Sequence, residues 1–393
     1  MFTLFLYDKF KRLTKKKILI FIDWFLPGYK AGGPVRSMAN MVEHLAGMYD
    51  FYIVTRNTDY QETEPYADID HNKWVEYQKG VKIFYASSEF QGKKTFKRLI
   101  QEEAFDIVYV NGIYSWKYSI LPLLVLKKSG IKKIIVASRG MLTQSAINIK
   151  SDKKRLFLII ARILGLYNGI TFHVTNDKEG YDVKKAVGKN ADVIVASNLP
   201  RKNKEQYRQI KKQPGELRFV NLARIAPEKN ILYALERLVD IGNISGNITF
   251  DIYGQIYDKE YWKKCERVIL KLPENIKVNY KGTVETDGVA NTISNYHFLF
   301  MPTLGENFGH VILESLFVGR STLISDQTPW RNMEDKRAGW DLPLEDTKVW
   351  GEKIRELLNM EDAEYQEWSR GAQSVAKEYV NSQRIIDAYI AMF

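Results

Sequence analysis

The stretch HFLFMPTLGENFGHVILESLFVG, residues 297–319, has the strand–loop–helix pattern from which α/β sheets are built. Its first part, 297–303, is a short apolar run typical of a buried strand, and its last part, 308–319, has the spacing of an apolar helix. The loop between them contains Gly305 and Glu306. The pattern therefore predicts a carboxylate just ahead of a helix N-terminus.

The same alternation extends over most of the chain. In the first half, further apolar runs predict strands at 16–25, 51–57, 81–87, 106–112, 132–140, 169–176 and 191–198. In the second half, they predict strands at 217–224, 247–254, 276–282 and 321–326, with a helix at 231–242. We expect two α/β domains, each a doubly wound parallel sheet that binds ligands at the carboxyl ends of its strands, facing across a cleft.

Composition limits the class of protein and of partner. The chain has 393 residues, more than one hydrophobic core usually serves, and a single cysteine, Cys265, which fits a reducing compartment. Residues 1–200 contain 31 Lys and Arg against 19 Asp and Glu, a balance of +12, whereas residues 201–393 contain 27 against 28, a balance of −1. This asymmetry favours an anionic partner for the first half. With no zinc-ligand or RNA-binding signature, lipid is favoured over nucleic acid, and mere solubility remains the alternative.

The N-terminus carries an amphipathic pattern. Apolar residues recur at helical spacing, with basic residues around and after them: Phe2, Phe5, Leu6, Phe10 and Leu13; Lys9, Lys11, Arg12 and Lys15 to Lys17. The pattern is typical of a helix lying in a membrane interface, and equally of a basic tail or a helix packed on the domain. No segment reaches the roughly 18 to 20 apolar residues that span a bilayer, and the N-terminus does not have the order of a secretory signal.

Two loops at strand-to-helix junctions carry candidate ligands. AGGP (31–34) follows the first strand, and its glycines allow positive φ and a close approach of the backbone to a ligand, although paired glycines often simply turn the chain. LARIAPEKN (222–230) follows the first strand of the second half. There Arg224 and Lys229 form a fork and a point charge suited to a diphosphate, or else a solvated capping loop.

The third loop is the one in the opening stretch. The amides of Asn307, Phe308 and Gly309 are expected to be unpaired N–H groups at the start of a helix, able to hold phosphate oxygens. Glu314 lies within the apolar helix, where a bare carboxylate costs several kcal/mol unless a group such as a sugar hydroxyl donates to it. The alternative is that Glu314 occupies the exposed stripe of that helix.

The combination of these features is more specific than any one of them. ARIAPEKN (223–230), MPTLGENFGHVILES (301–315), the glycine loop and the doubled α/β layout occur together and in order. In this the chain resembles the family-four glycosyltransferases, which are nucleotide-sugar-dependent retaining enzymes of the GT-B fold. The resemblance covers nearly all of 17–393 and is most specific across 217–331, which includes ISDQTPWRN (324–332).

The resemblance implies a domain organisation. It consists of a basic amphipathic segment, a Rossmann-like acceptor domain, a linker, a Rossmann-like nucleotide-sugar donor domain and a terminal helix that crosses back onto the first domain: 1–16, 17–198, 199–216, 217–375 and 376–393.

The resemblance also implies roles for the candidate residues. Glu306, Arg224 and Lys229 would be catalytic, with Arg224 and Lys229 on the donor diphosphate and Glu306 on the donor sugar hydroxyls. The amides of 307–309 would hold phosphates or sugar, Glu314 would take the ribose hydroxyls, and Gly33 would approach the diphosphate.

The mechanism implied needs no metal or cofactor. Arg224, Lys229 and amide dipoles would stabilise the charge that develops on the leaving diphosphate, in place of a divalent metal. The acceptor would attack from the same face as the leaving group, which gives retention of configuration. The leaving phosphate would serve as the base. The D-x-D pair Asp68 and Asp70 is interpreted as a surface loop and not as a metal site.

The sequence departs from the family pattern in two places. Asn111 stands where many relatives carry a histidine, and Asn307 stands where a glycine is often found after the first glutamate. A role for Asn111 in orienting the donor sugar is therefore left open, and Asn111 is also a candidate residue on the acceptor side. Arg139, in SRGM, is a candidate ligand for acceptor or phosphate, or alternatively part of a structural salt bridge.

The function expected is transfer of a hexose from a UDP- or GDP-linked sugar to a lipid-linked or saccharide acceptor in surface polysaccharide biosynthesis. The protein would be cytoplasmic and peripheral on the anionic inner face of the plasma membrane, without a nucleic-acid partner. A soluble-acceptor sugar transferase and a non-hydrolysing sugar-nucleotide epimerase of the same fold remain alternatives.

Overall fold

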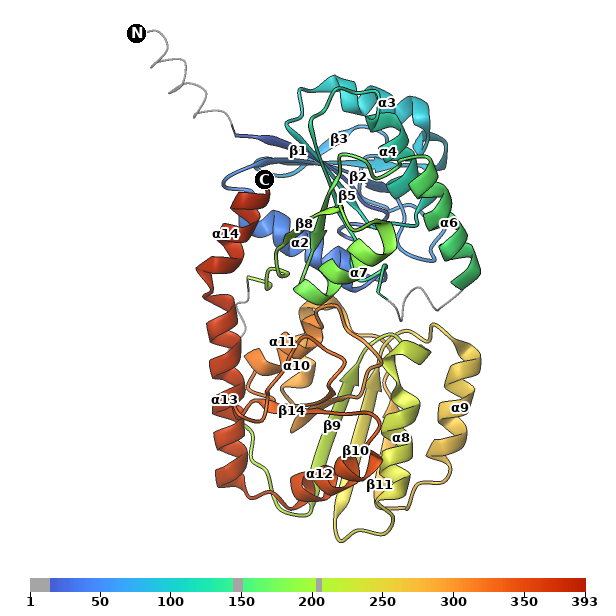
Figure 1. Cartoon of the computed structure of the whole chain (residues 1–393). Helices are drawn as coiled ribbons and strands as arrows, with labels where there is room; N and C mark the ends of the chain where they lie inside the picture. Colours follow the sequence, from blue (N-terminus) through green and yellow to red (C-terminus); the bar gives the residue numbers. More distant parts are fainter. Residues whose placement is uncertain (1–14, 144–150, 203–206) are drawn as a thin grey trace, which may run out of the picture. The chain divides into compact units, whose positions relative to one another are not determined.

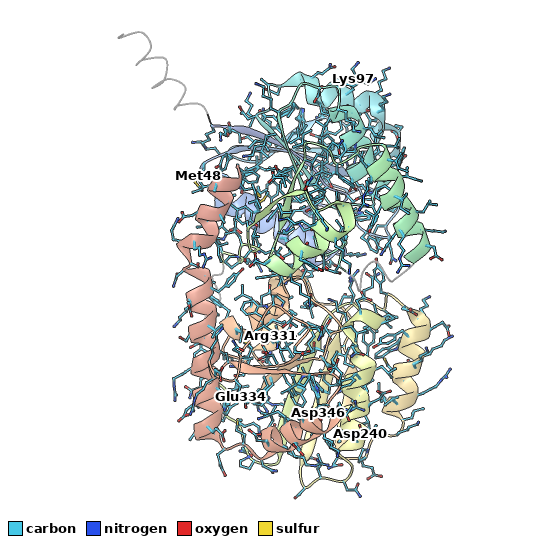
Figure 2. All side chains as sticks on the ribbon, viewed as in Figure 1. Met48, Lys97, Asp240, Arg331, Glu334 and Asp346 are labelled. Atoms are coloured by element: carbon cyan, nitrogen blue, oxygen red, sulfur yellow. The ribbon has the colours of Figure 1, made fainter. Side chains whose placement is uncertain are left out.

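A computed structural model of the chain describes residues 15–143, 151–202 and 207–393 (Figure 1). Nearly all of the amphipathic segment predicted at 1–16 lies outside the described residues. The chain divides into two compact units: unit 1 contains Met1–Lys202 together with Gln383–Phe393, and unit 2 contains Asn203–Ser382. In each unit, side chains fill the layers between a sheet and the helices that cover it (Figure 2).

Unit 1 is built on an eight-stranded sheet in the order β3-β4-β2-β1-β5-β6-β7-β8. All neighbouring strands pair in parallel except β3, which runs antiparallel to β4 at the edge. The strands are β1 (Lys17–Phe21), β2 (Asp50–Arg56), β3 (Trp74–Gln78), β4 (Val81–Ala86), β5 (Ile107–Asn111), β6 (Lys133–Ala137), β7 (Thr171–Val174) and β8 (Asp192–Val195). The helices are α2 (Gly33–Leu45), α3 (Lys93–Glu102), α4 (Leu121–Leu126), α6 (Ser151–Ile163), α7 (Asp177–Val187) and α14 (Gln383–Met392), with short turns η1 (Ser88–Phe90) and η2 (Trp116–Ile120).

The unbroken apolar runs of this half reflect burial on both faces of the sheet. In β1, Leu19 and Phe21 belong to one buried cluster, whereas Ile18 and Ile20 belong to another on the opposite face. Side chains alternate across a strand, so a strand covered on both sides needs apolar residues at every position. Helices α3, α4, α6 and α7 contribute to the first cluster, and α2 and α14 to the second.

Unit 2 is a six-stranded, wholly parallel sheet in the order β11-β10-β9-β12-β13-β14. Its strands are β9 (Glu216–Leu222), β10 (Asn247–Tyr253), β11 (Ile276–Tyr280), β12 (Phe298–Met301), β13 (Thr322–Ser325) and β14 (Gly339–Leu342). Its helices are α8 (Ile231–Asp240), α9 (Lys259–Ile269), α10 (Val289–Ile293), α11 (His310–Phe317), α12 (Thr347–Asn359) and α13 (Asp362–Val380), with short turns η3 (Pro227–Lys229) and η4 (Thr286–Gly288). The expectation of two parallel, doubly wound α/β domains is thus confirmed.

In both sheets the order in which the chain adds strands reverses at a central strand, β1 in unit 1 and β9 in unit 2. In unit 2 the chain proceeds from β9 outward through β10 and β11, then returns to β12 on the other side of β9. In unit 1 it proceeds from β1 to β2 and later returns to β5 on the other side of β1. Loops that leave the carboxyl ends of two such strands diverge to opposite faces and leave a crevice, which is where α/β sheets bind ligands.

The C-terminal helix belongs to unit 1, as the resemblance implied. Helix α13 ends in unit 2 at Val380, and α14 then packs on the α2 face of the first sheet. Tyr389 is fully buried there, and Phe393 packs edge-on against Tyr49 with ring centroids 5.4 Å apart. The apolar face at the end of the sequence therefore completes the core of the first domain.

The stretch expected as a linker, 199–216, divides between the two units: 199–202 belong to unit 1, where Leu199 is buried in the core, and 207–216 belong to unit 2. Lys212 is buried and donates from Nζ to the carbonyl oxygens of Gln213 at 3.0 Å and Leu358 at 2.9 Å. Burial lowers the pKa of the Lys212 ammonium to about 8. The polar composition of this stretch thus reflects hydrogen bonds to carbonyl groups as well as exposure.

Truncation of Tyr389 tests whether α14 is part of the core of unit 1. Tyr389→Ala removes a fully buried aromatic side chain and should lower the free energy of unfolding by about 3–5 kcal/mol in chemical denaturation. Ile390→Ala, on the same helix with 44% of the side chain exposed, is the matched control and should change stability little. Equal effects of the two substitutions would show that α14 does not contribute to the core.

Candidate active site

The first two loops of unit 2 that carry candidate residues are joined at the switch point. β9 and β12 pair in parallel, so the loops after them leave the same edge of the sheet side by side. The carbonyl oxygen of Glu228 accepts hydrogen bonds from the amide of Leu304 and from Oγ1 of Thr303, both at 2.9 Å. Nδ2 of Asn230 donates to the carbonyl oxygen of Pro302 at 2.9 Å. Three hydrogen bonds therefore join the two loops to each other.

This joining places Lys229 against Glu306, although 77 positions separate them in the sequence. Nζ of Lys229 donates directly to Oε1 of Glu306, and each side chain is 14% exposed. Two charges withdrawn from water attract each other strongly, but either is costly to leave without a partner. Loss of either partner would therefore leave the other charge poorly solvated.

Arg224 lies on the same loop, with other partners. One terminal nitrogen of its guanidinium is 3.3 Å from Oε1 of Glu228, and the group lies 4.9 Å from the ring centroid of Tyr257. The side chain is 40% exposed, so its charge remains largely hydrated. A planar fork stacked on an aromatic ring is well placed to meet an oxyanion without large rearrangement.

The loop between β12 and α11 has a fixed shape. Gly309 has φ of +79°, and a Cβ added there would lie 2.8 Å from Cδ1 of Ile312, so only glycine fits without strain. Helix α11 begins at His310, two residues later than the pattern predicts, which places 307–309 in the loop before the helix. The amide of Glu306 donates to the carbonyl oxygen of Gln327 at 3.1 Å, which ties this loop to the one after β13.

Phe308 differs from the other residues expected near the donor. Its side chain is buried, its ring packs on Trp330 with centroids 5.7 Å apart, and its carbonyl oxygen accepts from Nε1 of Trp330 at 2.6 Å. Next along the chain, Nε of Arg331, labelled in Figure 2, lies 3.0 Å from Oδ2 of Asp341. Phe308 and Trp330 therefore anchor the loop between β12 and α11 to the segment after β13.

Glu314 is half-buried on α11, one turn after the first helical residue. Its neighbours Leu313 and Ser315 are buried, so Glu314 lies at the border of the packed face of the helix. This position agrees with neither extreme considered for the sequence, because the carboxylate is neither deep in the core nor on a fully exposed stripe.

In unit 1, the loop after β1 provides an open backbone. Gly32 caps α2 with φ of +73°, and α2 begins at Gly33. A Cβ added to Gly33 would meet nothing within 4 Å, so this backbone lies bare. Positive φ is thus required at Gly32, whereas Gly33 keeps space free for an approaching group.

Asn111 and Arg139, predicted separately, are hydrogen-bonded to each other. Nε of Arg139 donates to Oδ1 of Asn111 at 2.8 Å, and the two terminal nitrogens donate to Oδ1 of Asn198 at 2.8 Å and to the hydroxyl of Tyr109 at 3.0 Å. None of the ion pairs between described residues includes Arg139, so the expected alternative of a structural salt bridge is not what the structure has. The guanidinium is therefore oriented by neutral acceptors.

A buried carboxylate that the sequence reading missed holds the Arg139 loop. Glu179 is 2% exposed and accepts from the hydroxyl of Ser138 and the amide of Gly140, both at 2.6 Å. It also accepts from the amide of Thr175 at 2.7 Å. The available signal was the capping-box spacing of Asn176, which caps α7, and Glu179 three residues on.

His173 extends this network into the core. Its Nε2 lies 2.8 Å from the carbonyl oxygen of Ala196, so that nitrogen carries the proton, and Nδ1 accepts from the Tyr109 hydroxyl at 2.6 Å. Burial, and secondly the charge of Arg139, lower the pKa of His173 to about 3. The imidazole is therefore neutral at neutral pH, and the Tyr109 hydroxyl can accept from Arg139 while donating to His173.

Other candidates from the sequence lie apart from these sites. Cys265 is buried in the core of unit 2, where burial raises the pKa of its thiol to about 12. Asp70 is exposed and lies 3.0 Å from Nζ of Lys73. In the described part of the chain, no three His, Cys, Asp or Glu side chains gather in a way that could hold a metal ion, and no helix is long and apolar enough to cross a membrane.

Known proteins resemble the chain in part of its sequence and in its fold. Residues 202–375 match the family model described as Glycosyl transferases group 1. The structure is similar to sucrose-phosphate synthase from Thermosynechococcus elongatus, with a TM-score of 0.68, 14% identity, and coverage of 96% of this chain and 97% of that one. No curated protein sequence matches the chain.

Two further solved structures share the fold. Anabaena HepE, solved in complex with UDP and glucose, has a TM-score of 0.64 at 12% identity and covers 96% of this chain and 100% of its own. WaaG, a glycosyltransferase involved in lipopolysaccharide biosynthesis, has a TM-score of 0.59 at 13% identity, covering 95% and 98%. The chain therefore has the GT-B fold, and the match to the glycosyltransferase family model lies within unit 2 apart from its first residue.

The neutral state of His173 predicts a specific pH dependence of stability. Its pKa of about 3 in the folded chain lies below its unfolded value near 6.5, so as pH falls the unfolded state takes up a proton first. Between pH 7 and pH 5 this proton uptake should lower the free energy of unfolding of unit 1 by roughly 2 kcal/mol. His173→Gln has no imidazole to titrate, so its free energy of unfolding should not show this decrease. The variant should be less stable than wild type at pH 7, with the difference shrinking at pH 5 in chemical denaturation. A difference independent of pH would contradict a neutral, buried His173.

Proposed function

We propose that the chain is a retaining glycosyltransferase that moves a hexose from a UDP- or GDP-linked sugar to a lipid-linked or saccharide acceptor. The single observation that carries the proposal is the Lys229–Glu306 ion pair, which lies where the loops after β9 and β12 meet. It is largely withdrawn from water, with each side chain 14% exposed, and offers one positive and one negative group side by side. A sugar diphosphate presents the complementary groups, phosphate oxygens and hydroxyl donors, in adjacent positions.

Donor binding would proceed by exchange of partners. Phosphate oxygens take the place of the Glu306 carboxylate on Nζ of Lys229, and Glu306 turns to accept hydrogen bonds from the donor sugar. Neither charge is left bare in this exchange, so the penalty for breaking a buried pair is avoided. Arg224 adds a second cation, and Glu314 accepts from the ribose hydroxyls.

The chemical step would be stabilised electrostatically. As the anomeric C–O bond breaks, negative charge grows on the leaving diphosphate, where Lys229, Arg224 and the amides of 307–309 meet it. In this proposal these fixed groups do the work of a divalent metal, and no cofactor takes part. The acceptor hydroxyl attacks from the side that the diphosphate leaves, its proton passes to the leaving phosphate, and the configuration is retained.

The acceptor side of the proposal rests on unit 1. Arg139 is oriented by Asn111, Asn198 and Tyr109, all neutral, so its charge is free to bind a phosphate or an acidic sugar of the acceptor. Gly33 leaves the backbone open for the donor diphosphate. A carboxamide is not basic enough to take the acceptor proton, and Oδ1 of Asn111 accepts from Arg139, so the proposed role of Asn111 is to hold Arg139.

The relatives support this choice of donor and pathway. A neighbour solved with UDP and glucose supports a nucleotide-sugar donor, and one involved in lipopolysaccharide biosynthesis supports a role in surface polysaccharide. We place the protein in the cytoplasm, peripheral on the inner face of the plasma membrane. The sucrose-phosphate synthase likeness favours the second candidate, a transferase with a soluble acceptor. An epimerase would instead release free nucleotide from the donor with no acceptor present.

Thermal-shift measurements with nucleoside diphosphates test the donor site. Either UDP or GDP should raise the melting temperature in the presence of EDTA, and Lys229→Ala should weaken that binding roughly 10- to 100-fold, since it removes a charge-assisted hydrogen bond. Lys263→Ala is the matched control, because Lys263 lies in the same unit in an exposed pair with Glu260. Stabilisation that requires added magnesium, or that survives in Lys229→Ala, would contradict the donor site proposed.

Replacement of Arg139 tests the acceptor assignment. Arg139→Ala should raise KM for a phosphate-bearing acceptor by roughly tenfold or more while the donor-induced thermal shift is retained. Arg98 has an exposed side chain on α3 of the same unit, so Arg98→Ala should leave both measurements unchanged. Loss of donor binding in Arg139→Ala would assign this arginine to the donor or to the fold instead.

A further inference from the structure

Helix α6 (Ser151–Ile163) is apolar on two faces. One face carries Phe157, Leu158 and Ala161, which pack against the core of unit 1. The other face and the residue after the helix leave large aliphatic side chains in water: Leu156 58%, Ile159 56%, Ile160 46%, Ile163 78% and Leu164 63% exposed. A surface helix usually has a polar outer face, so one that is apolar on both sides is covered by something outside the domain. We call these five residues the α6 face.

The α6 face is a concentrated feature. Of the 17 large hydrophobic side chains that are exposed among the described residues, five fall within 156–164. Their spacing of three, four, seven and eight places them along one side of the helix. Figure 1 shows α6 on the outside of unit 1, away from its sheet. The five side chains therefore form one continuous strip and not scattered surface residues.

The surroundings of the α6 face are basic. On the helix itself Lys153, Arg155 and Arg162 are exposed. Nζ of Lys127 reaches the carbonyl oxygen of Leu164 at 2.9 Å, and Nε of Arg162 reaches that of Val187 at 3.1 Å, so the ends of α4 and α7 border the strip. Both ends bring further exposed basic residues: Lys128, Lys184, Lys185 and Lys189.

The stretch of sequence that contains this border carries most of the net charge of the chain. Residues 121–192 contain 14 Lys and Arg against 5 Asp and Glu, a balance of +9. Unit 1 as a whole contains 34 against 20, which is +14, and unit 2 contains 24 against 27, which is −3. An aliphatic strip rimmed by cations matches the interface of an anionic bilayer, where apolar groups enter the acyl boundary and Lys and Arg meet the phosphates.

We propose that the α6 face docks unit 1 on an anionic phospholipid bilayer, with Leu156, Ile159, Ile160, Ile163 and Leu164 inserted below the headgroups. The proposal rests on the proposed function in one respect, since it names the surface through which a lipid-linked acceptor is met. Helix α6 connects the parallel strands β6 and β7, so it runs back against them and its N-terminal end lies at the edge that carries Arg139. Docking thus orients the Arg139 side of unit 1 with respect to the membrane.

Vesicle binding by the full chain tests the proposal. Vesicles of phosphatidylglycerol mixed with phosphatidylcholine should sediment the wild-type protein, and Ile159→Ser/Ile163→Ser/Leu164→Ser should weaken binding at least about tenfold. The matched control is Leu270→Ser/Tyr280→Ser, which removes two exposed hydrophobic residues from unit 2 and should bind as wild type. Lys153→Gln/Arg155→Gln should lose affinity mainly at low salt, because charge and apolar insertion contribute separately.

The readouts separate this proposal from the donor site. The nucleotide-induced thermal shift and the circular dichroism spectrum should be unchanged in the triple serine variant. The three side chains are exposed, and none of them belongs to the proposed donor site. Unchanged vesicle binding by that variant would overturn the proposal, even if the donor site is correct. A wild-type chain that dimerises in solution, is made monomeric by the three serines and ignores vesicles would also overturn it and assign the face to a second copy. Vesicle binding that depends on the face, without any nucleotide effect, would uphold docking and refute the donor site.

Discussion

The ion pair between Lys229 and Glu306 is the constraint on which the proposed chemistry of unit 2 depends. It joins two loops that the chain delivers 77 residues apart, and it can exist only because β9 and β12 are neighbours at the reversal of strand order. The hydrogen bonds from Leu304, Thr303 and Asn230 fix the loops so that the charges meet without a hinge. In the proposed function, a ligand that brings both a charge for Lys229 and donors for Glu306 leaves neither group without a partner, so a sugar phosphate fits this site better than a simple anion.

Unit 1 holds its cation in a different manner. Arg139 is fixed by the neutral groups of Asn111, Asn198 and Tyr109, and the loop around it is fixed by the buried carboxylate of Glu179. Tyr109 is in turn held by His173, whose imidazole stays neutral because it is buried. In unit 2 the charge of Lys229 is paired with the carboxylate of Glu306. In unit 1 the charge of Arg139 is held by neutral groups and not by a carboxylate. In the proposed function, the first arrangement suits a donor that must be released as a diphosphate, and the second suits an acceptor.

Much of the fold was predictable because its signals are local. The apolar runs marked the central strands of both sheets, since a strand buried on both faces has no polar position. The edge strands β3 and β14 were missed for different reasons. β3 is antiparallel and largely exposed, whereas β14 is parallel and buried but has only four residues, GWDL, with Asp341 among them. The residues of the loops could be named as candidates, but their pairing could not, because Lys229 with Glu306 and Asn111 with Arg139 depend on strand order. The α6 face could not be predicted either, because the exposure of its side chains follows from how the helix packs.

A structure of the protein with a bound nucleotide sugar tests the central claim most directly. The account predicts phosphate oxygens within hydrogen-bond distance of Nζ of Lys229, a sugar hydroxyl on the carboxylate of Glu306, and the ion pair between them broken. A nucleotide bound elsewhere on the chain, with the Lys229–Glu306 pair intact, would contradict it.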